Sequence, residues 1–177
     1  MKPHSDYFKH NPPRCLDSFI AKSVDIENLE YDGHGEDINP VFGIECKCGN
    51  TNHKVDGFCW TNPDNGIAFF IGPLGLTCTK CNSHNEVFDI EQYGYDSELG
   101  HGCSSASGEG DHSSFTCDQC DGHTFHILAR FEFTADLFDD DFLEARGREK
   151  DLFTWFSLHG ICVDCANVTQ ICDYECA

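Results

Sequence analysis

Four short cysteine pairs are the residues of this chain whose type and spacing best suit chemistry. They are Cys46-Lys-Cys48, Cys78-Thr-Lys-Cys81, Cys117-Asp-Gln-Cys120 and Cys162-Val-Asp-Cys165. Each pair puts two thiols on one short turn, and two such turns together supply the four thiolates that a tetrahedral metal ion needs. In chain order the pairs predict two ions, one held by Cys46, Cys48, Cys78 and Cys81 and one by Cys117, Cys120, Cys162 and Cys165.

Metal binding competes with disulfide formation for the 13 cysteines of the chain. The first residues are polar and interrupted by Pro3, so we expect no signal peptide. No run approaches the roughly 18 apolar residues of a membrane-spanning helix. We therefore expect a cytoplasmic protein, and in a reducing compartment paired cysteines bind metal more often than they form disulfides. The sequence predicts two structural zinc ions and no membrane partner.

The sequence offers alternative ligands for the first ion. Cys46-Lys-Cys48 is one residue shorter than the other three pairs, which strains the usual turn, and His53 or Cys59 is an alternative ligand. Cys172 and Cys176 are an alternative third site together with Cys103 or a histidine. The sequence assigns no role to Cys15, Cys103, Cys172 and Cys176.

Alternating apolar residues and turn signals predict the elements that must position these pairs. We expect strands over residues 21–26, 41–45, 53–60, 67–77, 86–91, 123–134, 152–161 and 167–175. Residues 1–17 contain three prolines and predict an irregular lead-in. Acidic residues early and basic residues late in residues 134–150 predict an inserted helix that begins at Thr134.

Two parts of the chain repeat each other. Residues 78–91 align with residues 162–175 without a gap, so that the second pair of each half coincides and Phe88 falls on Cys172. Leu74 and Leu158 each precede their cysteine pair by four residues. A shared apolar pattern at the same offset favours an internal repeat over chance coincidence of the cysteines.

The cysteine pairs and their flanking strands resemble zinc-ribbon proteins in general, over roughly residues 42–91 and 115–177. The resemblance implies one small antiparallel sheet and one structural metal ion per ribbon, but no particular function. We predict a mainly β fold of two tandem zinc-ribbon-like antiparallel units with a short acidic helix inserted in the second. Residues 1–98 would hold an N-terminal strand and the first ribbon, residues 99–114 a Gly/Ser-rich linker, and residues 115–177 the second ribbon.

The net charge of the chain limits the classes of partner that it is expected to bind. Thirty-one acidic residues against 11 basic ones give a net charge of −20, which repels nucleic acid and attracts basic proteins. We therefore expect a non-enzymatic scaffold that binds a basic protein, for example an immunity or inhibitor protein against a bacterial toxin. An alternative is a nucleic-acid or transcription-machinery binding protein that stacks bases on Phe58, Trp60, Phe69 and Phe70. A zinc enzyme is disfavoured because four thiolates leave no open coordination position.

Overall fold

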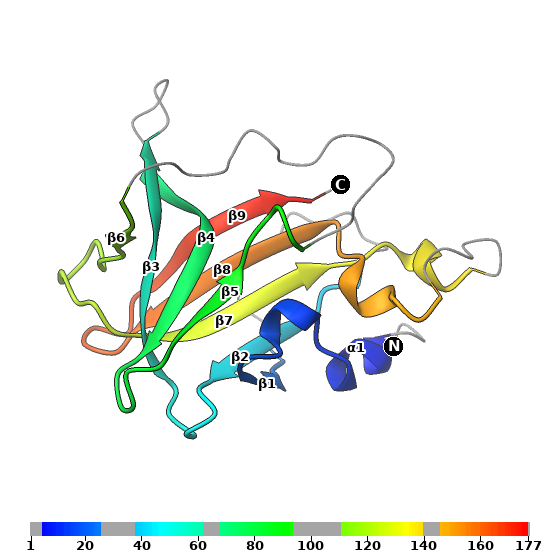
Figure 1. Cartoon of the computed structure of the whole chain (residues 1–177), viewed down its shortest axis with the longest axis horizontal. Helices are drawn as coiled ribbons and strands as arrows, with labels where there is room; N and C mark the ends of the chain where they lie inside the picture. Colours follow the sequence, from blue (N-terminus) through cyan, green and yellow to red (C-terminus); the bar gives the residue numbers. More distant parts are fainter. Residues whose placement is uncertain (1–4, 26–37, 62–67, 94–110, 140–145, 177) are drawn as a thin grey trace.

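The computed structural model describes residues 5–25, 38–61, 68–93, 111–139 and 146–176. In these ranges the chain is mainly β, with nine strands in one curled antiparallel sheet (Figure 1). The predicted fold class is confirmed. The strands are β1 Ile20–Ser23, β2 Val41–Glu45, β3 Asn52–Thr61, β4 Ala68–Cys78, β5 His84–Phe88, β6 Ser113–Ser114, β7 Phe125–Glu132, β8 Trp155–Cys162 and β9 Val168–Glu175.

Strand β7 lies at the centre of the sheet. Apart from Leu128, its buried residues alternate with less buried ones, as in a strand with one face on the core. One edge pairs with β8 along the whole strand. The other edge is shared, since Phe125 and His126 pair with β3 whereas residues 128–130 pair with β2. The strands of both predicted units therefore hydrogen-bond into one sheet, while the predicted domain limits stay a prediction.

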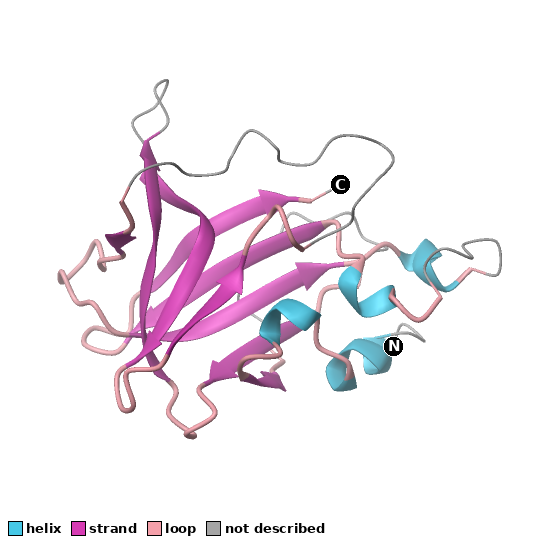
Figure 2. Ribbon diagram, viewed as in Figure 1, coloured by secondary structure: helices cyan, strands magenta, loops and turns pink. Residues whose placement is uncertain are grey.

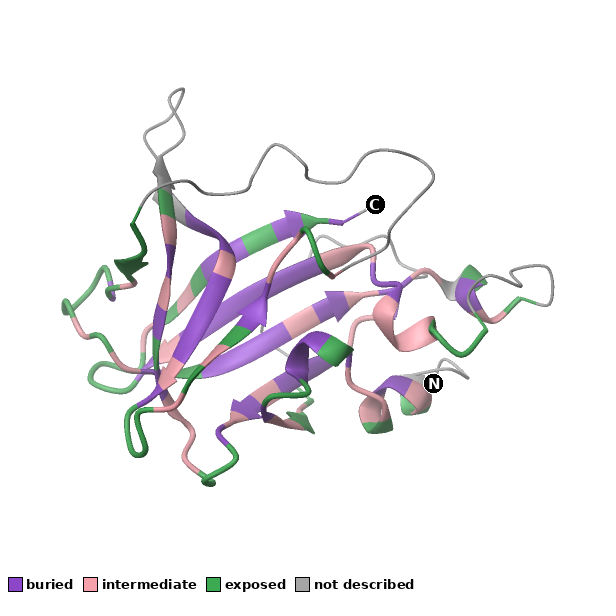
Figure 3. Cartoon of the chain, viewed as in Figure 1, coloured by how far each residue is buried: buried purple, intermediate pink, exposed green. Residues whose placement is uncertain are grey.

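The sheet curls so that β3, β4 and β5 pack over the inner face of β7, β8 and β9 (Figure 3). The ring of Phe88 on β5 stacks on that of Phe156 on β8, with centroids 4.0 Å apart. The hydroxyl of Tyr174 on β9 accepts a hydrogen bond from the backbone amide of Gly72 on β4. The hydrophobic core lies between these two layers and is rich in phenylalanine.

The strand register reproduces the repeat seen in the sequence. Leu74 pairs with Phe88 in the first unit, and Leu158 pairs with Cys172 in the second. In both units the register shifts directly after that leucine. The hairpins β4–β5 and β8–β9 are therefore structural copies, including their irregularity.

Short helices gather beside one end of the sheet (Figure 2). The lead-in predicted to be irregular contains α1 Ser5–His10 and the 3-10 turn η1 Arg14–Leu16, which corrects that prediction. Phe8 on α1 is fully buried, and its ring stacks on Phe133 with centroids 3.9 Å apart. Burial of this aromatic ring explains why a short, proline-flanked segment is ordered.

The acidic insertion forms a short helical turn rather than a helix that runs through residues 134–150. The 3-10 helix η2 spans Ala135–Phe138 and ends because Asp139 adopts an extended conformation, with ψ at 145°. A second turn, η4, spans Glu149–Asp151. Residues 140–145 lie outside the described ranges.

Candidate metal centres

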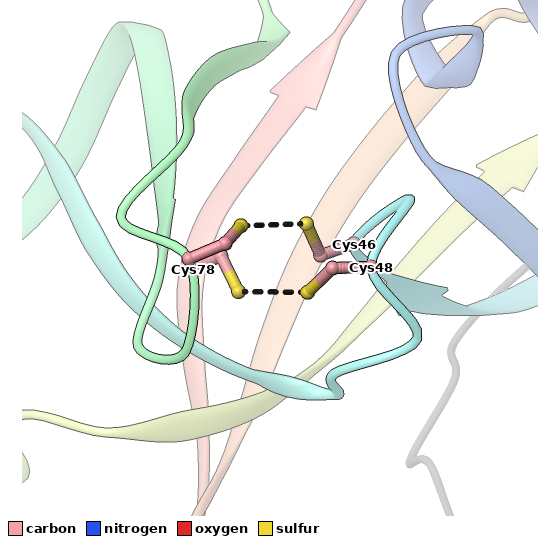
Figure 4. A group of neighbouring side chains, drawn as sticks. Cys46, Cys48 and Cys78 are labelled. Atoms are coloured by element: carbon pink, nitrogen blue, oxygen red, sulfur yellow. Dashed lines mark hydrogen bonds between the residues drawn. The ribbon is translucent and has the colours of Figure 1, made fainter.

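The first group of thiols lies where the turn after β2 meets the turn between β4 and β5. Cys46 and Cys48 follow β2, while Cys78 ends β4 and Cys81 closes its turn. The Sγ atoms of Cys46 and Cys81 lie 3.5 Å apart, and those of Cys48 and Cys78 lie 3.6 Å apart. Figure 4 shows Cys46 and Cys48 facing the turn that carries Cys78.

The second group is built in the same way from the corresponding elements. Cys117 and Cys120 lie on the turn before β7, and Cys162 and Cys165 lie at the end of β8 and in the turn to β9. The Sγ atoms of Cys117 and Cys165 are 3.6 Å apart, and those of Cys120 and Cys162 are 3.5 Å apart. In each group all four sulfurs lie within 4.8 Å of one another.

These separations fit a shared metal ion. Two thiolates bound tetrahedrally to zinc at about 2.3 Å lie about 3.8 Å from each other. The sulfurs of a disulfide are much closer, at about 2.05 Å, and the eight cysteines are free thiols. Four thiols in this arrangement can hold a metal ion, and soft thiolate ligands suit zinc and iron centres.

All four cysteine turns share one unusual backbone feature. The residue after the second cysteine has a positive φ in each turn: Gly49, Asn82, Asp121 and Ala166. Among the described residues, these are all but one of the positions in the left-handed region, the other being Gly147. An alanine held there costs roughly 1–2 kcal/mol. The same left-handed conformation at four separate cysteine turns indicates a common requirement, the geometry that aims two thiols at one point.

The shortened Cys46-Lys-Cys48 turn is accommodated by glycine. The backbone N–H of Gly49 donates to the carbonyl of Cys46, one residue nearer than the corresponding bond from Asp121 to Cys117. Gly49 has a φ of 82°, which glycine adopts readily. The four thiols complete the first group without His53 or Cys59.

Glycine also makes room beside the second group. A Cβ atom at Gly122 would lie 3.0 Å from the sulfur of Cys162 and 3.2 Å from that of Cys120. It would also lie 2.6 Å from a carboxylate oxygen of Asp164. The backbone thus approaches the sulfurs more closely than any side chain would allow, as it does where amides surround a metal–sulfur centre.

One thiol in each group is strongly acidified. Burial acts to raise the pKa of Cys78, but hydrogen bonds from the backbone amides of Cys81 and Lys80 and from the Asn50 side chain lower it to about 6. The Asn50 amide nitrogen lies 3.4 Å from the Cys78 sulfur. In the second group the backbone amide of Gln119 is the main cause that lowers the pKa of Cys117 to about 7. A thiolate is the form of cysteine that binds metal.

Another thiol in each group resists ionisation. The backbone amide of Gly122 lowers the pKa of Cys120, but the neighbouring thiols and burial outweigh it and raise this pKa to about 12. The pKa of Cys48 rises to about 12 for similar reasons, against the lowering effect of the Asn50 amide. All four thiols can become thiolates together only when a cation compensates their charge, so the donor set fits a divalent metal ion.

The other cysteines that the structure describes do not join the metal groups. Cys15, Cys172 and Cys176 are buried, whereas Cys59 is exposed on β3. Burial raises the pKa of the Cys15 and Cys172 thiols well above the usual value, so both stay protonated. Cys172 packs in the core at the repeat position of Phe88. Cys103 lies outside the described residues.

Two side chains near the first group were not singled out in the sequence. The hydroxyl of Ser83 lies 3.2 Å from the sulfur of Cys81 and 3.4 Å from that of Cys46, and Asn50 contacts Cys78. Both follow a cysteine pair by two residues, and a polar residue at this offset is the signal that would have found them. These two side chains add hydrogen-bond contacts to the cysteine sulfurs.

The proposed base-stacking residues find little support. Phe70 is buried and Phe58 is partly buried against the core. The side chains of Trp60 and Phe69 lie outside the described residues.

Comparisons with protein-family models, with curated protein sequences and with solved structures gave no match. Among the described residues no helix is long and apolar enough to cross a membrane.

Proposed function

We propose that this protein is a non-enzymatic zinc scaffold whose acidic surface binds a basic protein. The observation that carries the proposal is the pair of closed four-thiol groups on a chain of net charge −20. Four thiolates occupy all positions of a tetrahedral zinc ion, so neither ion would have a position for substrate or reactive water. The metals then act as staples, and the charged surface carries the function.

The turns of the second cysteine group form a more acidic surface than the turns of the first group. Asp118, Asp121 and Asp164 are exposed on its turns. The matching turns of the first group carry the exposed Lys47 and Lys80 instead, with Lys80 at the repeat position of Asp164. A four-thiolate zinc centre adds two further negative charges. This end is therefore the surface where we place the basic partner.

One form of this proposal is an immunity or inhibitor protein that covers the basic surface of a bacterial toxin. Complementary charge would speed association and make it sensitive to salt. The function is thus binding by charge, without chemistry at the metal ions.

The metal content is tested by native mass spectrometry of the purified chain. Two zinc ions per chain, of which one is lost when the cysteines of either group are changed to serine, support the scaffold. A metal-free chain with disulfides between the cysteine pairs would overturn it.

The partner surface is tested by affinity capture from cell extract at low and high salt. We expect a basic protein that is lost at high salt and is captured poorly by the triple variant Asp118→Asn, Asp121→Asn, Asp164→Asn. The matched control Asp17→Asn, Glu91→Gln, Asp111→Asn removes three exposed acidic charges elsewhere. Equal capture by both triple variants, or binding that salt does not weaken, would contradict the proposal.

A further inference from the structure

The two cysteine groups share one pattern of burial but differ in what surrounds their sulfurs. In each group the first cysteine of both turns is buried and the second is exposed. A small neutral reagent therefore reaches the two groups in the same way. When both groups hold metal, all eight sulfurs are thiolates, so a difference in reactivity must come from the hydrogen bonds and charges around them.

Side chains donate hydrogen bonds to the sulfurs of the first group. The Asn50 amide nitrogen lies 3.4 Å from the sulfur of Cys78. The Ser83 hydroxyl lies 3.2 Å from the sulfur of Cys81 and 3.4 Å from that of Cys46, and beside a thiolate it acts as the donor. A hydrogen bond to a thiolate draws electron density from the sulfur and makes it less nucleophilic. These donors therefore lower the reactivity of the first group.

The second group lacks such donors at the equivalent positions. Gly122 stands where the first group has Asn50, two residues after the second cysteine of its turn. Asn167 stands where the first group has Ser83, but its amide donates to the carboxylate of Asp118 instead. Within the described ranges, the side chains that contact the sulfurs of the second group are those of its own cysteines. Its thiolates therefore keep more of their electron density.

The charges beside the two groups have opposite sign. The turns of the first group carry Lys47 and Lys80, whereas Asp164 takes the repeat position of Lys80 in the second. A Cβ atom at Gly122 would lie 2.6 Å from a carboxylate oxygen of Asp164 and 3.0 Å from the sulfur of Cys162, so both flank one small space. A nearby carboxylate repels the charge of a thiolate and makes the sulfur a stronger nucleophile, whereas a lysine does the opposite.

We propose that the second cysteine group is a modification site for hydrogen peroxide and similar neutral oxidants, and that the first group resists them. The exposed thiolate of Cys120 attacks one peroxide oxygen, the O–O bond breaks, and hydroxide leaves a sulfenic acid on Cys120. The thiolate of Cys162, whose sulfur lies 3.5 Å away, then displaces a second hydroxide and closes a disulfide. The two sulfurs lose two electrons to the peroxide, and two protons convert both hydroxides to water.

Oxidation releases the metal ion of the second group. With Cys120 and Cys162 joined, Cys117 and Cys165 alone do not fill a tetrahedral shell. The turns that carry these cysteines form the acidic surface on which we place the basic partner, so oxidation changes that surface. The inference goes beyond binding by charge, and it rests on the zinc content proposed above.

The test uses the full chain with two zinc ions bound, which native mass spectrometry verifies before oxidant is added. Hydrogen peroxide is then added, and a colorimetric chelator follows zinc release against a sample without peroxide. Remaining thiols are alkylated with iodoacetamide in denaturant, and peptide mass spectrometry identifies the oxidised cysteines. We expect one zinc to be released about three- to tenfold faster than the other, with Cys120 and Cys162 oxidised while the first group is still alkylated.

Reciprocal variants test the cause of the difference. Ser83→Ala and Lys80→Asp give the first group surroundings like those of the second, and each should speed its oxidation. Asp164→Lys should slow oxidation of the second group. The matched control Asp111→Lys makes the same charge change at an exposed position outside both groups, and Ser114→Ala removes an exposed hydroxyl on β6. Neither control should alter the rate of either group.

Each outcome decides the proposal. Equal release of the two ions, or faster oxidation of the first group, overturns it and leaves the zinc scaffold intact. Controls that change the rates as much as Ser83→Ala and Asp164→Lys also overturn it. A chain that holds no zinc before peroxide is added overturns this proposal and the scaffold together. The comparison of the two groups within the unmodified chain needs no variant, so it stays decisive where a variant does not fold.

Discussion

Among the four residues that follow a cysteine pair, Ala166 has the side chain least suited to the left-handed backbone conformation. Its φ is 60°, whereas the equivalent residue of the first unit, Asn82, has a φ of 57° and is of a type that tolerates this region. Asp121 and Gly49 hold the same position in the other two turns. The geometry of the turn is therefore kept across four different side chains.

Replacing Ala166 by glycine should stabilise the metal-loaded protein. Relief of the left-handed conformation outweighs the extra freedom of glycine in the unfolded chain, and we expect the free energy of unfolding to rise by about 0.5–1 kcal/mol. Denaturant unfolding measures the change. The matched control Asn82→Gly should gain less than half as much, and an equal or larger gain there would contradict the explanation.

His159 makes the stability of the protein sensitive to acid. Burial, and secondly the charge of Arg130, lower the pKa of its imidazole to about 4 from the usual 6.5. Between these values the unfolded chain binds a proton that the folded chain does not, so stability falls as the pH falls. From about pH 7 to about pH 5 this histidine should cost about 2 kcal/mol of unfolding free energy.

The variant His159→Leu removes the titrating group and keeps an apolar side chain of similar reach. Its unfolding free energy should fall less than that of the parent over the same pH range. Both proteins share the pH effect of proton binding to the cysteines, so the difference between them measures the contribution of His159 alone. Identical pH dependence in both proteins would show that the imidazole does not titrate with folding.

At the scale of the elements, Phe88 joins the two copies of the repeat. It ends β5 and stacks on Phe156 of β8, and it is fully buried. The variant Phe88→Ala should lower the free energy of unfolding by about 3–5 kcal/mol. Val168→Ala, at an exposed position of β9, serves as the control and should change it by less than about 0.5 kcal/mol. Thermal and denaturant unfolding measure both, and a small loss in Phe88→Ala would mean that the two layers hold together without it.

The sequence predicts elements well where local pattern and tertiary structure agree. Val41–Glu45 has the predicted bounds of β2, and the alternation in residues 123–134 gives β7. Strand β6 could not be predicted, because two serines carry no strand pattern and their order comes from pairing with β3. Helix α1 was missed because contacts with distant residues stabilise it, namely the burial of Phe8 and the hydrogen bond from the Tyr7 hydroxyl to Glu149.

The same reasoning explains why the cysteine groups could be predicted and the contacts of Asp56 with His84 and His112 could not. The cysteine groups can be recognised because both thiols of each pair lie close together in sequence. The hydrogen bonds of Asp56 to His84 and His112 depend on a glycine in an intervening strand and on the backbone pairing of β6. Sequence spacing therefore reveals local ligand sets and hides contacts that strand register assembles.

For the whole molecule, the shared strand β7 predicts that the two metal groups stabilise one cooperative structure. The variant Cys165→Ser weakens the second group, yet we expect faster hydrogen exchange in β3, β4 and β5 as well as in β7, β8 and β9. Hydrogen exchange with mass spectrometry measures each segment. Faster exchange confined to β7–β9, or two separate thermal transitions, would instead show two independent domains.

The division of β7 between β2 and β3 also matters while the chain is being made. Strands β2 and β3 are complete about 60 to 80 residues before β7 is synthesised, which takes several seconds at about 5–20 residues per second. During this interval the edges that will receive β7 have no strand to pair with. All four cysteines of the first group precede β7, so a metal ion captured early can hold β2 against the end of β4, and β4 in turn pairs with β3. Both edges then stay aligned until β7 arrives.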